Sequence, residues 1–173
     1  MKLRLVDEQD LDFVRELRQD PEVVKYLGSF ILLNQEKQIQ WFKSLINDKS
    51  KMYLILEDDN EKFGYVRITK IDYIHRSVCV GGDIHKDCRG KGLSSKMFEL
   101  IFDLCFNKMN MNRVWLFVLE TNERAIHIYK KNGFVEEGRQ RKAIYKDGKY
   151  LDYIMMSILK DEYYNKKEIR NGK

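Results

Sequence analysis

Asp87-Cys88-Arg89-Gly90-Lys91-Gly92-Leu93-Ser94 is the most informative stretch of this chain. It follows residues 77–84, which alternate like a strand, and precedes residues with helical periodicity. A loop that opens a helix in this way turns successive backbone N–H groups outward, and the helix N-terminus adds partial positive charge. The glycines let the backbone approach an anion closely, and Arg89 and Lys91 add charge. The stretch therefore predicts a phosphate-binding loop.

Two familiar phosphate-binding patterns do not match this loop. It lacks the Gly-Lys-Ser/Thr of a Walker loop, and it has only two of the three glycines of the dinucleotide fingerprint. A helix-entry turn with basic surface residues explains the loop equally well, so a functional interpretation needs a second feature.

The second feature is the run Asn122-x-x-Ala125-Ile126-x-x-Tyr129-x-x-x-Gly133-Phe134. On a helix, Asn122, Ala125, Ile126 and Tyr129 fall on one face, which places an amide and a phenol on a small, apolar stripe. A tyrosine alone would be interpreted as a core residue. The phosphate loop about thirty residues upstream, followed by a helix and a strand, favours a functional site instead.

Together these residues resemble the GNAT acetyltransferase superfamily. Its phosphate loop, Gln/Arg-x-x-Gly-x-Gly/Ala, is matched by Arg89-x-x-Gly92-x-Ser94, and its later motif by the Asn122–Phe134 run. The resemblance covers residues 1 to about 160 and is strongest to the branch that acetylates ribosomal-protein N-termini, amino sugars and polyamines. The stretches that carry it are Tyr73-Ile74-His75-Arg76-Ser77, Gly133-Phe134-Val135-Glu136-Glu137-Gly138 and Asp147-Gly148-Lys149-Tyr150-x-Asp152.

The resemblance implies a single α/β (α+β) domain, with a mixed, mostly antiparallel sheet flanked by helices, and acetyl-CoA as the acetyl donor. The loop would hold the CoA pyrophosphate, and the strand edge near Ile84 would pair with the pantetheine. Asn122 would help to hold acetyl-CoA, and Tyr129 would protonate the departing thiolate. The predicted CoA-binding residues are Ile84, Arg89, Gly90, Lys91, Gly92, Leu93, Ser94 and Asn122.

The general base is the point where the chain departs from this branch. Cys79 stands where related sequences often have a glutamate that deprotonates the amine. Asp83 shares a strand face with Cys79 if the alternation holds, although Gly81-Gly82 could hide a bulge. His75 and His85 are further candidates, and a water relay is equally acceptable.

Three amine acceptors compete. Residues 28–42, which border the acceptor site in this fold, contain one acidic residue, Glu36, and a polycation needs carboxylates. We therefore expect an amino sugar, on a nucleotide carrier, to rank above a protein N-terminus and a polyamine. Candidate stacking residues for such a sugar are Tyr26, Phe30, Trp41, Phe42 and Tyr73. The non-enzymatic alternative is an acetyl-CoA-binding regulatory domain.

Length and composition fit one cytoplasmic domain. The chain has 173 residues, a net charge of +5 and three cysteines without metal-like spacing. No apolar run approaches the ~18–20 residues of a membrane span, and no signal peptide or nucleic-acid module is evident. We expect a domain over residues 1–160, a charged, mobile tail over 161–173, no metal, and a monomer or homodimer.

The hydrophobic periodicity predicts alternating strands and helices in one mixed sheet. Asp7 and Asn34 stand at helix N-cap positions, and Asp147-Gly148 predicts a hairpin turn. Expected strands are 2–6, 52–56, 63–71, 77–84, 113–119, 134–145 and 149–159, and expected helices 7–18, 21–27, 34–46, 94–106 and 122–131.

Overall fold

A seven-stranded sheet forms the centre of the computed structural model, which describes residues 1–28, 34–45 and 47–171, with side chains to residue 168. Phe30 and Ile46 lie outside the described residues. The strand order is β1-β2-β3-β4-β5-β7-β6, and only β4 and β5 pair in parallel. The strands are β1 Lys2–Leu5, β2 Met52–Asp58, β3 Glu61–Asp72, β4 Ser77–Ile84, β5 Arg113–Leu119, β6 Val135–Lys146 and β7 Lys149–Leu159. The predicted mixed, mostly antiparallel α/β domain is confirmed.

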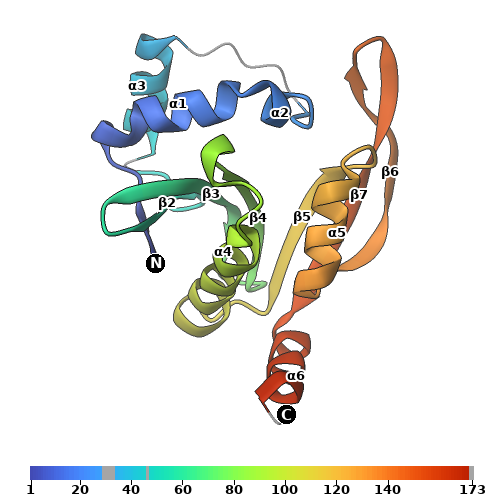
Figure 1. Cartoon of the computed structure of the whole chain (residues 1–173). Coiled ribbons are helices and arrows are strands. Elements are labelled where there is room, and N and C mark those ends of the chain that lie inside the picture. Colours follow the sequence, from blue (N-terminus) through green and yellow to red (C-terminus); the bar gives the residue numbers. More distant parts are fainter. Residues whose placement is uncertain (29–33, 46, 172–173) are drawn as a thin grey trace.

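Helices cover both faces of the sheet because the buried strands alternate apolar side chains between two cores. Leu54, Leu56 and Val66 belong to the core with α4 (Leu93–Phe102), which α5 (Glu123–Asn132) also contacts. Ile55 and Tyr65 belong to the smaller core with α1 (Leu11–Gln19). The short helices α2 (Pro21–Val24) and α3 (Gln35–Ser44) lie near α1 (Figure 1).

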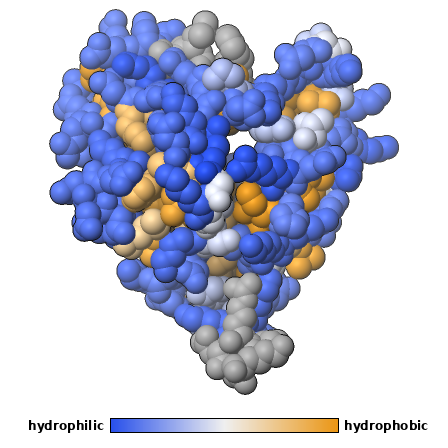
Figure 2. All heavy atoms as spheres, viewed as in Figure 1, coloured by the Kyte–Doolittle hydropathy of each residue, from blue (hydrophilic) through white to orange (hydrophobic). Residues whose placement is uncertain are grey.

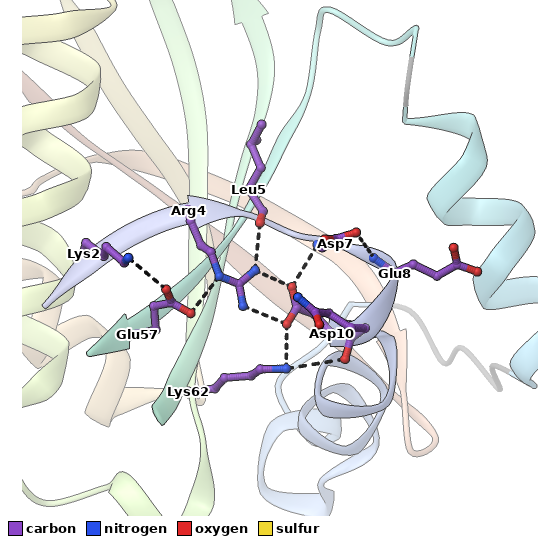
Figure 3. Close-up of polar contacts among 9 residues, drawn as sticks. Lys2, Arg4, Leu5, Asp7, Glu8, Asp10, Glu57 and Lys62 are labelled. Carbon is purple, nitrogen blue, oxygen red and sulfur yellow. Dashed lines mark hydrogen bonds and ion pairs between the residues drawn. The ribbon is translucent and has the colours of Figure 1, made fainter. Parts of the chain in front are cut away.

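An ionic network fixes the start of the chain to the sheet. Asp7 and Asp10 form a reciprocal capping box around the 3₁₀ turn η1 (Glu8–Asp10), as the sequence predicts. Asp10 is fully buried, and its carboxylate accepts hydrogen bonds from Arg4 at 2.6 and 2.9 Å and lies 2.6 Å from the Lys62 ammonium (Figure 3). Arg4 also pairs with Glu57 at 2.7 Å. The network joins β1, β2 and β3 to the turn that leads into α1.

Two helical segments near the C-terminal half differ from expectation. After α4, the helix continues with π-type hydrogen bonding (η3, Asp103–Lys108). Residues 161–171 of the expected tail belong to α6 (Lys160–Asn171), a helix that the sequence did not predict. The ring of Tyr163 packs against Phe102 and Phe106, with ring centroids 5.3 Å apart in both pairs. Burying an aromatic side chain is favourable even in a charged segment, which explains why the helix forms here.

The feature that positions the site is the separation of β4 from β5. Their parallel register runs only from Ser77↔Arg113 to Cys79↔Trp115, although β4 continues to Ile84 and β5 to Leu119. The two strands diverge beyond that point (Figure 1). The β6–β7 hairpin, whose predicted Asp147-Gly148 turn has φ of 50° and 78°, extends past the rest of the sheet. In the described part of the chain, none of the helices has the length and apolar character to cross a bilayer.

Candidate active site

A cavity of about 420 Å³ opens where β4 and β5 diverge. It is lined by α2, β3, β4, the start of α4, β5, α5 and β7, so both predicted motifs meet there. In the space-filling view the surface is hollowed between the part that carries α1 and α2 and the β6–β7 hairpin (Figure 2). Lys146 of the hairpin donates hydrogen bonds to the carbonyls of Val24 and Leu27, at 2.9 and 3.2 Å, which holds the hairpin against the α2 side.

The phosphate loop has the backbone that an anion site requires. Gly90 and Gly92 have φ of 79° and 74°, and an added Cβ at either position would meet open space. Gly92 is the N-cap residue of α4, whose N-terminus has no side-chain cap. Leu93 and Ser94 line the cavity at this end, whereas Lys91 is exposed and does not. A left-handed glycine ahead of an uncapped helix N-terminus fits a diphosphate.

Arg89 lines the cavity, but its guanidinium is already engaged. It donates to the carbonyl of Ile84 at 3.1 Å and pairs with the Asp20 carboxylate at 2.5 Å. Asp20 in turn accepts a hydrogen bond from the backbone of Glu22 at the start of α2. The side chain of Arg89 therefore ties the phosphate loop to the end of β4 and to α2. Ile84 is buried and lines the cavity where the resemblance places the pantetheine.

Asn122 and Tyr129 reach the same cavity from α5. The Asn122 side chain accepts a hydrogen bond from the backbone of Ala125 at 3.1 Å, so it caps the helix as well as facing the cavity. The Tyr129 ring packs edge-on against Phe98, with centroids 5.7 Å apart. Burial, reinforced by the nearby Asp83 carboxylate, raises the pKa of Tyr129 to about 12. The phenol is therefore protonated at neutral pH, as a general acid must be.

An ion pair that the sequence did not predict lines the same cavity as Tyr129. Arg67 of β3 pairs with Asp83 of β4 at 2.6 Å, and Arg18 of α1 pairs with the same carboxylate at 3.3 Å. The β3–β4 register is regular across Gly81 and Gly82, so the bulge that we considered is not present there. Gly81 lies opposite Arg67, and an added Cβ would fall 2.8 Å from its guanidinium. The missing side chain thus makes room for Arg67.

The candidate bases fare differently in the structure. His75 is exposed in the β3–β4 turn and does not line the cavity, which argues against its predicted role. His85 stacks on Phe13 and borders a separate, smaller hollow. Burial raises the pKa of the Cys79 thiol, so this residue stays protonated. Asp83 does line the cavity, but two arginines compete for its carboxylate.

Comparison with known proteins identifies the family. The family model described as the acetyltransferase (GNAT) domain matches residues 1–135. The chain belongs to the GNAT acetyltransferase family. It is an acetyl-CoA-dependent N-acetyltransferase, as the two motifs predict.

Its relatives cover nearly the whole GNAT chain. The spermidine N(1)-acetyltransferase of Escherichia coli K12 is 31% identical over 94% of this chain and 88% of its own length. The L-amino acid N-acetyltransferase of the same strain is 26% identical over 91% of this chain and 97% of its own. The solved spermidine N-acetyltransferase of Vibrio cholerae, in complex with CoA and spermine, has a TM-score of 0.90 at 28% identity, covering 95% of this chain and 98% of that one.

Proposed function

We propose that this GNAT enzyme transfers acetyl from acetyl-CoA to a primary amine of a polyamine such as spermidine. The observation that carries the proposal is the full-length similarity to spermidine acetyltransferases, one of them with CoA and spermine bound. The similarity favours the polyamine alternative over the amino sugar that the sequence analysis ranked first.

Several residues that line the cavity suit an alkylammonium ligand. They include Glu22 and Tyr26 of the α2 region, Phe117 of β5 and Tyr153 of β7. A carboxylate and aromatic rings suit ammonium groups joined by methylenes. The sequence analysis considered carboxylates only in residues 28–42, whereas Glu22, which precedes that segment, lines the cavity. Trp41 and Tyr73 do not line the cavity, and residues 29–33 lie outside the described ranges.

The proposed chemistry is direct transfer. The neutral amine attacks the carbonyl carbon, an N–C bond forms, the C–S bond breaks, and the departing thiolate takes a proton from Tyr129. The nitrogen releases its surplus proton to solvent, and solvent returns a proton to the Tyr129 phenolate. A positioned general acid is worth ~10²–10⁴ in rate.

A second candidate is an amine next to an anionic group, such as an amino acid or a nucleotide-linked amino sugar. Arg67 favours it, because this guanidinium lines the cavity. The similarity to an L-amino acid acetyltransferase points the same way.

The test compares kcat/KM for spermidine, an L-amino acid, a short N-terminal peptide and a nucleotide-linked amino sugar under the same conditions. Spermidine is expected to lead by at least tenfold, and an anionic amine leading by that margin would overturn the proposal. Glu22→Gln should raise the KM for spermidine about two- to fivefold, the value of an exposed ion pair. Glu36→Gln is the matched control, because Glu36 is exposed on α3 outside the cavity.

A further inference from the structure

Direct transfer requires a neutral amine, and the described cavity offers no free group to deprotonate one. Its carboxylates are Glu22, which pairs with Lys25 at 2.6 Å, and Asp83, which pairs with Arg67 and Arg18. An alkylamine near the lysine reference pKa of ~10.4 is almost wholly protonated at neutral pH. Another feature of the site must therefore increase the neutral fraction.

The cluster of Arg67, Arg18 and Asp83 has a net charge of +1, because two guanidiniums share one carboxylate. Both guanidiniums bond to the same Asp83 oxygen, Oδ2. The side chains are only 24%, 18% and 15% exposed, so solvent screens the excess charge weakly. Burial lowers the pKa of Arg18 and Arg67 lowers it further, which is how an uncompensated like charge acts.

The excess charge faces the place where the acceptor nitrogen must react. Arg67 and Asp83 line the cavity together with Tyr129, whose phenol lies close enough to be influenced by both. The other titratable groups around Arg67 do not cancel its charge. Tyr65 of β3 and Tyr129 of α5 have raised pKa values and stay neutral, as does Cys79 of β4, and Glu22 of α2 is paired with Lys25. Tyr153 of β7, whose pKa burial also raises, is neutral too.

We propose that Arg67, held in place by Asp83, replaces the general base by lowering the pKa of the acceptor amine across the cavity. This inference rests on the proposed N-acetyltransferase chemistry but not on the identity of the amine. The ammonium loses its proton to water before transfer, and the neutral nitrogen then attacks the thioester as above. Asp83 is a positioning residue in this scheme and accepts no proton.

The magnitude follows from Coulomb's law. A unit charge about 10 Å away at an effective dielectric constant of 20 shifts a pKa by roughly one unit. One unit corresponds to about a tenfold change in neutral amine at pH 7. Arg67→Met should therefore lower kcat, measured at saturating amine, about tenfold at pH 7 and move the acidic limb of kcat up by about one pH unit. The loss should shrink and vanish as the pH rises past ~10.5, where the bound amine becomes neutral in both enzymes.

The experiment measures kcat against pH from 6 to about 11, with both acetyl-CoA and the amine saturating, because kcat reports the groups of the bound complex. The amine is spermidine or, if spermidine is not turned over, a primary amine that the enzyme does acetylate. Arg67→Lys should keep the acidic limb near its wild-type position, because lysine also carries a positive charge. Asp83→Asn removes a negative charge but keeps an acceptor oxygen for Arg67, so the acidic limb of kcat should move to lower pH. Lys43→Met removes an exposed cation on α3, outside the cavity, and should shift nothing.

Two results would overturn the inference. One is an Arg67→Met loss that is the same at every pH, which would indicate a structural role only. The other is an acidic limb that moves to higher pH in a folded Asp83→Asn enzyme, as it would if Asp83 took the proton from the amine. Loss of spermidine turnover alone, with another amine accepted, would refute the proposed acceptor and leave this test intact.

Discussion

Asp10→Asn probes how the start of the chain is held against the sheet. The Asp10 carboxylate accepts two bonds from Arg4, one from Lys62 and one from the backbone amide of Asp7, all within 2.9 Å. Asparagine has one acceptor oxygen and turns an N–H₂ group toward these cations. Breaking a buried ion pair costs ~3–5 kcal/mol, and Arg4 keeps its contact with Glu57. We expect a loss of about 3 kcal/mol, or roughly 6–12 °C in Tm.

The assay is urea unfolding at several pH values, with Asp12→Asn as the control. Asp12 pairs with Arg15 on the surface at 81% exposure, so its loss should cost under ~0.5 kcal/mol. Burial alone would raise the pKa of Asp10, but hydrogen bonds from Arg4 and Lys62 outweigh it and hold the pKa well below its usual range. Its contribution is therefore complete above the unfolded pKa of ~3.9 and is lost as the pH falls further. Equal losses in both variants, or a difference that persists unchanged at pH 2, would refute this account.

The remaining predictions concern the acetyl-CoA site. Gly92→Val should abolish acetyl-CoA binding in calorimetry, because a side chain at φ 74° blocks the approach of phosphate. Gly148→Val, at φ 78° in the remote hairpin turn, is the control and should leave binding intact. Equal affinities of the two variants would contradict this prediction. Arg89→Ala should weaken acetyl-CoA binding by ~1.5–3 kcal/mol and also raise the KM for the amine, since Arg89 holds Asp20 beside α2; an unchanged KM would remove the second role. Tyr129→Phe should bind acetyl-CoA normally and lose roughly 10² or more in kcat, and a kcat close to wild type would make Tyr129 a packing residue.

Local patterns were enough to predict most of the fold. The capping box at Asp7, the cap at Asn34 and the Asp147-Gly148 turn are local signals, and the structure contains each of them. The α6 helix was missed because its packing depends on Tyr163 reaching Phe102, a contact between distant parts of the sequence.

The site was predicted in outline for the same reason. Each of the two motifs is one unbroken stretch of sequence. Spacing within the stretch was therefore enough to select residues that line the cavity, such as Gly92, Asn122 and Tyr129. Arg67 could not, because its role depends on the pairing of β3 with β4, which places it over Gly81 and beside Asp83. His75 was selected from its neighbourhood in the sequence, and the turn between these strands carries it away from the cavity.

Acetyl transfer to an amine is the central claim, and the most direct measurement follows isotope-labelled acetyl from acetyl-CoA in one reaction with wild-type enzyme and spermidine. Labelled N-acetylspermidine and free CoA should form in equal amounts at a rate far above the enzyme-free reaction, and Tyr129→Phe should slow the formation of both together. Binding of acetyl-CoA with no labelled product from spermidine or any other amine tested would contradict it, and would make the chain an acetyl-CoA-binding domain without transferase activity.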